Sequence, residues 1–148
     1  MNTVDEILDY AIDREQQAVD FYVELAERVE RGWMRDMLLD YSREEMRHKS
    51  KLMEVKEGNR LLAAGSTITD LKIVDYLVDV EPAADISMQD ALIVAMKREK
   101  AAYRLYMDMA SRVKDEELKS LFLGLAQEEA KHKLYFETQY DDRVLAQN

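Results

Sequence analysis

Two stretches decide the fold: LLDYSREEMRHKSKL at residues 38–52 and FLGLAQEEAKHKLYF at residues 122–136. In both, apolar residues recur every three or four positions, which is the spacing of one face of an α-helix. A glutamate and a histidine three residues apart interrupt that face, Glu45 and His48 in the first stretch and Glu129 and His132 in the second. Because positions i and i+3 lie on one side of a helix, each stretch predicts a helix that turns a carboxylate and an imidazole inward.

A further helix is predicted upstream of each stretch. Residues 4–29 and 88–113 carry apolar stripes at helical spacing, interrupted by Glu15 in the first and by Glu99 in the second. Thr3 and Ser87 stand before these stripes as N-caps, each with an acidic residue three positions later that completes a capping box. Each upstream helix therefore adds one inward carboxylate.

The two halves of the chain match without a gap at an offset of 84 residues. The matched pairs are Thr3 with Ser87, Leu8 with Leu92, Ala11 with Ala95, Arg14 with Arg98, Ala18 with Ala102, Tyr22 with Tyr106, and Val29 with Val113. This agreement predicts an internal duplication of a helical hairpin.

The spacing of the helices predicts their connections. Glycine favours the C-terminal end of a helix, so we expect the first helix to end near Arg31-Gly32 and the second at Gly58. Short turns then make two antiparallel hairpins, 4–57 and 88–138. Residues 58–87 form a long connection with one apolar patch, 71–80, where we expect a short helix.

These connections define an all-α fold class. We predict a ferritin-like four-helix bundle, because the connection 58–87 is long enough to cross over along a bundle helix. The alternative is an up-down bundle in which this connection is only a loop. We expect one domain over residues 1–148, with a tail at 139–148.

The composition supports helices and excludes several functions. The 148 residues hold only 4 glycines and 1 proline, too few for the turns of a β-sandwich or barrel. Cysteine is absent, which excludes thiol catalysis, iron–sulfur clusters and cysteine-bound zinc. A net charge of -10 repels a phosphate backbone, so no nucleic-acid partner is expected. Neither a signal-peptide nor a membrane-span pattern occurs, and we expect a cytoplasmic protein without membrane contact.

The six inward polar side chains converge at one level. Glu15 lies 16 residues before Arg31, and Glu45 and His48 follow it by 14 and 17; the second hairpin repeats this spacing about Asp115. At 1.5 Å per residue, all six lie about 24 Å from the turn. Two divalent cations would balance four buried carboxylates, and oxygen with imidazole ligands suits iron or manganese. A metal-free Glu–His network is the alternative, although four acids and two bases leave it unbalanced. The predicted metal ligands are Glu15, Glu45, His48, Glu99, Glu129 and His132.

These motifs resemble the ferritin-like di-iron carboxylate superfamily, and rubrerythrins in particular. The resemblance covers about residues 3–138, and its motifs are Glu15-x-x-Ala18-x-x-x-Tyr22, Glu44-Glu45-x-x-His48, Glu99-x-x-Ala102-x-x-x-Tyr106 and Glu128-Glu129-x-x-His132. It implies two iron ions, with manganese or zinc as alternative occupants. It also implies the roles of the ligands: single ligands Glu15 and Glu99, bridging or chelating Glu45 and Glu129, and one iron each for His48 and His132.

The chain departs from rubrerythrins in two respects. Rubrerythrins usually add a cysteine-bound rubredoxin domain as an electron relay, and this chain has no cysteine. They also tend to carry an extra glutamate one turn before the ligand of the third helix, where this chain has Met96. Both departures weaken the inference of peroxidase activity, but neither affects metal binding.

Other residues on the stripes have both a structural and a functional interpretation. Tyr22 and Tyr106 are either core tyrosines or proton donors to the oxygen substrate. Ala18 and Ala102 are either helix formers or residues that leave space for dioxygen or peroxide. Glu44 and Glu128 fall off the stripes, which favours a solvated face.

The sequence favours an oxidoreductase that reduces hydrogen peroxide or dioxygen with electrons from a separate donor protein. One alternative is ferroxidase activity with iron storage or handling, and another is a metal-binding module without turnover. We expect a homodimer, because a bundle of this size leaves a helical face exposed.

Overall fold

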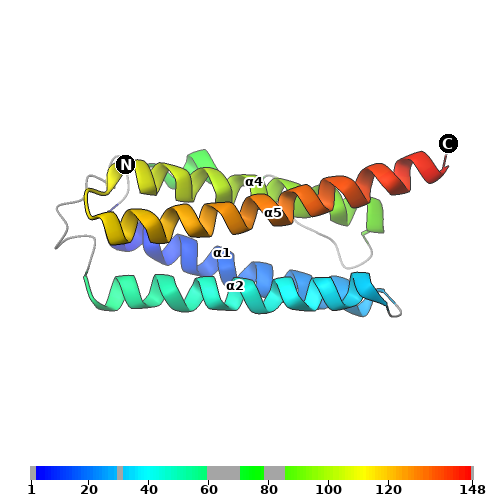
Figure 1. Cartoon of the computed structure of the whole chain (residues 1–148), viewed down its shortest axis with the longest axis horizontal. Coiled ribbons are helices and arrows are strands. Elements are labelled where there is room, and N and C mark those ends of the chain that lie inside the picture. Colours follow the sequence, from blue (N-terminus) through cyan, green and yellow to red (C-terminus); the bar gives the residue numbers. More distant parts are fainter. Residues whose placement is uncertain (1–2, 30–31, 60–70, 79–85, 148) are drawn as a thin grey trace. The chain divides into compact units, whose positions relative to one another are not determined.

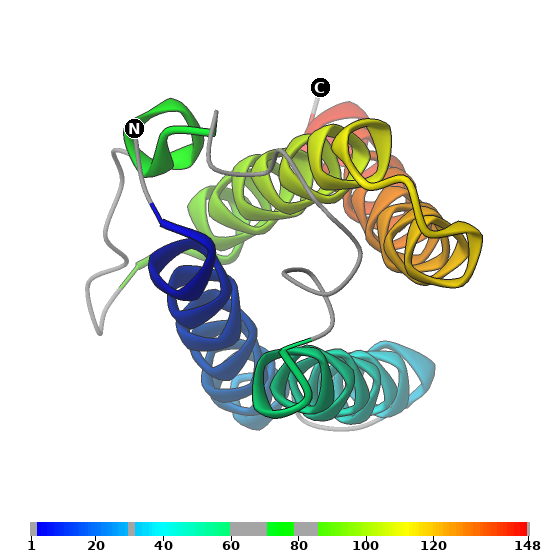
Figure 2. The ribbon, with the colours of Figure 1, turned by 90° about the vertical axis from the view of Figure 1, so that its left-hand side faces the viewer.

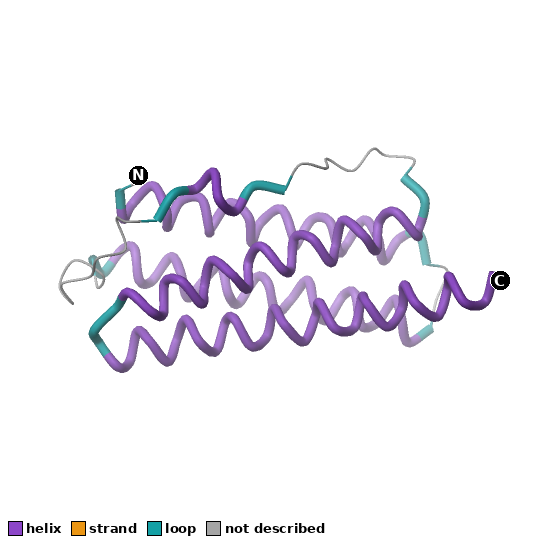
Figure 3. The backbone as a smooth tube through the Cα atoms, turned by 90° about the horizontal axis from the view of Figure 1, so that it is seen from above, coloured by secondary structure: helices purple, strands orange, loops and turns teal. Residues whose placement is uncertain are grey.

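The computed structural model describes residues 3–29, 32–59, 71–78 and 86–147. These ranges contain helices and loops and no strand, as Figure 3 shows. The elements, in chain order, are α1 (Val4–Glu27), α2 (Trp33–Glu57), the 3₁₀ helix η2 (Ile73–Tyr76), α4 (Met88–Arg112) and α5 (Glu116–Gln147).

The chain divides into two compact units, Met1–Ile73 and Val74–Asn148. In the first unit α1 packs along α2, and in the second α4 packs along α5 (Figures 1 and 2). Each pair is an antiparallel hairpin, as the short turns predicted. The described helices include none that is both long and apolar enough to cross a membrane.

Side-chain caps fix where three of the helices begin. The hydroxyl oxygen of Thr3 accepts a hydrogen bond from the amide of Glu6 (3.1 Å), and that of Ser87 accepts one from the amide of Asp90 (3.0 Å). Both N-caps were predicted. Asp115 caps α5 in the same way, because its Oδ1 accepts from the amide of Leu118 (3.1 Å). Each bond satisfies an amide that has no partner within its own helix.

The end of α1 differs from the prediction. The helix stops at Glu27 rather than near Arg31-Gly32, and the amide of Arg28 closes its last turn on the carbonyls of Leu25 and Ala26. Gly32 instead precedes α2 as its N-cap, with a φ of 108°. This left-handed backbone favours glycine, so Gly32 belongs to the start of the second helix. The predicted end of α2 is confirmed, because Gly58 is its C-cap.

The last helix is longer than expected. Helix α5 has 32 residues and continues to Gln147, so the segment 139–148, predicted as a tail, is helical over nearly its whole length. In the connection 58–87, the predicted short helix corresponds to η2, while residues 60–70 and 79–85 lie outside the described ranges.

The inward stripes form the core of each hairpin. Of the apolar stripe predicted over residues 4–29, Val4, Ile7, Leu8, Ala11, Tyr22 and Ala26 are buried, and Ala18 and Val29 are half-buried. Val19, Phe21 and Leu25 are buried as well, because a helix in a bundle is covered over an arc wider than one stripe. On the outer side of α2, Met46 and Met53 are each 40% exposed, whereas Met109 of α4 is fully buried.

The cap of α4 makes a direct test of this local structure. Ser87→Ala removes the oxygen that accepts from the amide of Asp90, so we expect the free energy of unfolding to fall by about 1 kcal/mol. Urea unfolding followed by circular dichroism measures it. Ser120→Ala, on the exposed side of α5, is the control and should not destabilise, because alanine favours helix interiors. Equal losses in both variants would contradict the role of the cap.

Candidate metal centre

The first hairpin brings three predicted ligands together. Glu15 comes from α1, and Glu45 and His48 come from successive turns of α2. Nδ1 of His48 lies 3.7 Å from Oε1 of Glu15 and 3.7 Å from Oε1 of Glu45. One ligand-type atom from each of the three residues lies within 4.8 Å of the other two. We call these three residues the first triad.

The second hairpin builds the same arrangement. Glu99 comes from α4, and Glu129 and His132 come from α5. Nδ1 of His132 lies 3.6 Å from Oε2 of Glu99. Ligand-type atoms of all three residues again lie within 4.8 Å of one another. These residues form the second triad, and each predicted ligand therefore lies beside the other two of its own hairpin.

Both triads are withdrawn from solvent. The exposed fraction is 2% for Glu15 and Glu99, 1% for Glu45, Glu129 and His132, and 0% for His48. Two carboxylates and one imidazole in such surroundings carry more negative than positive charge even when the imidazole is protonated. Buried charge of this kind costs several kcal/mol per group unless it is compensated. A divalent cation would supply that compensation.

The distances within the triads suit an ion better than hydrogen bonds. Nitrogen-to-oxygen hydrogen bonds are about 2.7–3.2 Å long, and the measured separations of 3.6 and 3.7 Å exceed that range. Two atoms bound to one ion at about 2.1 Å each are at most about 4.2 Å apart. Each triad therefore fits a hard or borderline divalent metal, such as iron, manganese or zinc, in both spacing and donor type.

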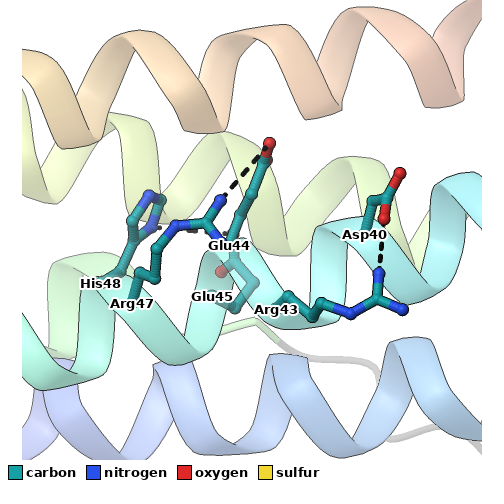
Figure 4. A network of polar contacts seen from close by, with 6 residues as sticks. All are labelled: Asp40, Arg43, Glu44, Glu45, Arg47 and His48. Atoms are coloured by element: carbon teal, nitrogen blue, oxygen red, sulfur yellow. Dashed lines mark hydrogen bonds and ion pairs between the residues drawn. The ribbon is translucent and has the colours of Figure 1, made fainter.

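The glutamate that precedes the ligand on α2 lies in different surroundings. Glu44 is paired with Arg47 at 3.9 Å, and its side chain is 32% exposed. Figure 4 shows this pair beside Glu45 and His48, with a second surface pair between Arg43 and Asp40 on the same helix. Ion pairs with this much access to solvent contribute at most about 1 kcal/mol. Glu44 and Glu128 are both half-buried, so neither lies on the fully solvated face that its position off the stripe predicted.

The predicted accessory residues divide by burial. Tyr22 and Tyr106 are each 1% exposed, and the ring of Tyr22 packs edge-on against that of Tyr41 at 6.2 Å. Ala18 and Ala102 are only half-buried. The tyrosines therefore lie on the inner side of their hairpins, whereas the alanines lie at the edge of that inner side.

Two contacts beside the first triad were not anticipated. Ser42 is buried three residues before Glu45, and its hydroxyl donates to the carbonyl of Val19 on α1 (3.2 Å). Nζ of Lys49, next to His48, donates to Oε1 of Gln16 (2.7 Å). Both contacts tie α2 to α1 at the level of the ligands. The signal for Ser42 was present in the sequence, because position 42 shares the face of Glu45.

The helices and the inward Glu and Glu-x-x-His motifs define a ferritin-like carboxylate protein. The sequence model of one family in this superfamily, rubrerythrin, matches residues 6–140. The chain therefore belongs to the rubrerythrin family, and the predicted all-α, ferritin-like four-helix fold class is confirmed. The family and the buried triads together fit a di-iron carboxylate protein.

A solved structure agrees with this fold. A hypothetical protein from Pyrococcus furiosus superposes with a TM-score of 0.71 and 24% sequence identity, over 94% of this chain and 89% of that one. At this identity the likeness concerns the fold alone. No curated protein matches the chain at a significant level.

Metal analysis tests the triads. After anaerobic loading with Fe(II) at neutral pH, we expect two ions per chain, and Glu45→Ala or Glu129→Ala should each lose at least one, because each removes a carboxylate from one triad. Elemental analysis of the desalted protein gives the count. The neighbouring Glu44→Ala and Glu128→Ala are matched controls that should retain two. One ion or none in the unchanged protein would contradict this ligand set.

Proposed function

We propose that the chain is a di-iron oxidoreductase that reduces hydrogen peroxide, or dioxygen, with electrons from a separate donor protein. The observation that carries the proposal is the pair of buried triads, each with two carboxylates and one imidazole. Membership of the rubrerythrin family supports it.

The donor set supports iron in a dinuclear centre. We propose that both triads contribute to one centre, with the six ligands Glu15, Glu45, His48, Glu99, Glu129 and His132. Four carboxylates balance the charge of two divalent cations, and carboxylate with imidazole is a donor set that iron accepts. Manganese and zinc accept the same donors. The donor set therefore does not select iron, and the identity of the two ions as iron is itself proposed. We also propose that the protein is a homodimer and is located in the cytoplasm.

The reaction needs electrons and protons in equal number. Two ferrous ions held by the triads would supply two electrons, which reduce one hydrogen peroxide to two waters as two protons are taken up. The chain's own residues keep the ligands out of water, because all six are nearly inaccessible to solvent. A dry site strengthens every charge interaction within it.

The tyrosines are the proposed proton donors. Tyr22 lies seven residues after Glu15, and Tyr106 seven residues after Glu99, a rise of about 10 Å along the helix. Side chains on a helix lean toward its N-terminus, so each tyrosine leans back toward the glutamate of its own helix. Both are buried, and a buried hydroxyl that is close to the substrate can donate a proton to it.

Electrons must come from outside these 148 residues. The chain has no cysteine, so it holds no thiolate-bound iron centre that relays electrons. A separate reductase or electron-transfer protein is therefore part of the proposed reaction.

Stopped-flow spectroscopy of the diferrous protein tests the function. We expect reoxidation to be faster with peroxide than with dioxygen, and catalytic turnover to require an added electron donor. Tyr22→Phe and Tyr106→Phe should slow the reaction with peroxide by about tenfold or more, because each removes a proton donor. Tyr10→Phe and Tyr103→Phe, on the same helices but less buried, are the matched controls. If dioxygen is the faster oxidant and ferric mineral accumulates beyond two irons per chain, the protein is a ferroxidase that stores iron.

A further inference from the structure

The outward side of α4 carries a row of exposed basic residues. Lys97, Lys100 and Arg104 are all exposed, and their spacing of three and four residues places them on one side of the helix. Glu99, buried on the inward side, belongs to the same turns. The row is unusual for a chain with a net charge of -10.

The row is absent from the matched helix α1. On α1, the positions 84 residues before Lys97 and Arg104 are Asp13 and Asp20, and both are exposed. The two helices thus carry the same inward glutamate and opposite charges outside. Helix α2 also carries exposed basic residues at helical spacing, Arg43, Arg47 and Lys51, but Arg43 and Arg47 are paired with Asp40 and Glu44.

Exposed apolar side chains border the basic row. The hydroxyl of Tyr76 in η2 donates to Oδ2 of Asp108 on α4 (2.5 Å), and the guanidinium of Arg104 lies over the Tyr76 ring at 5.8 Å from its centre. These contacts hold η2 against α4 while Val74 and Leu77 on either side of Tyr76 remain 66% and 53% exposed. Burial, together with the hydrogen bond to Asp108, raises the pKa of Tyr76, so the hydroxyl keeps its proton at neutral pH.

We propose that this surface, made of Lys97, Lys100, Arg104, Val74 and Leu77 and called here the α4 face, docks a small acidic electron-transfer protein. The inference rests on the proposed function, which requires an external donor. The inference adds the location of the docking site for that donor and the sign of the donor's net charge.

Charge complementarity selects the partner. An acidic protein is repelled by most of a chain with a net charge of -10, and the α4 face gives it an attractive orientation. Docked there, the donor is separated from the carboxylate of Glu99 by little more than the thickness of one helix, about 10 Å. The exposed Val74 and Leu77 supply the apolar contact that brief redox encounters combine with charge.

Charge reversal on the intact, iron-loaded and oxidised protein tests this docking. The probe is a reduced rubredoxin of net negative charge, and stopped-flow spectroscopy gives its second-order rate of electron transfer at several salt concentrations. We expect Lys97→Glu/Lys100→Glu to lower the rate at low salt by about tenfold or more and to flatten its salt dependence.

A matched control separates the α4 face from total charge. Lys51→Glu/Lys119→Glu changes two exposed lysines on α2 and α5 and alters the net charge by the same amount, so its rate should stay within about twofold of the unchanged protein. Reduction by dithionite should be equal in all three proteins, because it needs no docking. Equal rates with rubredoxin in both double variants would overturn the proposal.

A second variant tests the apolar part of the α4 face. Leu77→Ser leaves every charge in place, so we expect weaker binding of the rubredoxin with an unchanged salt dependence. An affinity equal to that of the unchanged protein would remove Leu77 from the docking surface.

Other outcomes are distinguishable. If Lys97→Glu/Lys100→Glu instead dissociates an oligomer, as light scattering would show, a second copy of the chain covers the α4 face and the proposal is wrong. Binding of oxidised rubredoxin to the metal-free chain, followed by NMR, tests docking without any redox reaction. If rubredoxin docks but peroxide is not reduced, the docking proposal stands and the proposed function is wrong. If peroxide is reduced but rubredoxin does not dock at the α4 face, the proposed function stands and the docking proposal is wrong.

Discussion

The structure depends on one constraint: carboxylates and imidazoles are turned toward the apolar side of their helices. A buried charge without compensation costs several kcal/mol. The position of α1 along the axis of α2 must therefore be fixed within narrow limits, so that Glu15 and Glu45 lie beside His48. The caps at Thr3 and Gly32 set where the two helices begin. Ser42 then ties α2 to the backbone of α1 close to the ligands.

Much of this arrangement could be predicted from the sequence, because helical periodicity and capping are local properties. The stripes gave the hairpins and indicated that each triad would face inward, and Ser87 marked the start of α4. The ends of elements were harder to predict. Gly32 was assigned to the end of the first helix, since glycine is common there, but its positive φ belongs to the start of the second. Helix α5 runs to Gln147 because no glycine or proline follows Gly124.

Packing contacts could not be derived from periodicity. The bond from Lys49 to Gln16 joins side chains 33 residues apart, and only the paired hairpin brings them together. The apolar stripes also carry no information about the charges on the outward side of each helix. The inward sides of α1 and α4 share a glutamate and a tyrosine, whereas their outward sides carry opposite charges at matched positions. The proposed metal binding and the proposed recognition of a protein partner thus use different sides of the same helix and can change independently.

The placement of the methionines bears on how the chain would withstand peroxide, the substrate proposed for it. Oxidation of methionine to the sulfoxide follows access to solvent, and cells reverse it enzymatically. Met46 and Met53 are each 40% exposed on the outer side of α2, whereas Met109 is fully buried in the core. The chain has no cysteine to oxidise irreversibly. Oxidation is therefore expected first at methionines outside the core, where a polar sulfoxide is tolerated and repair enzymes have access.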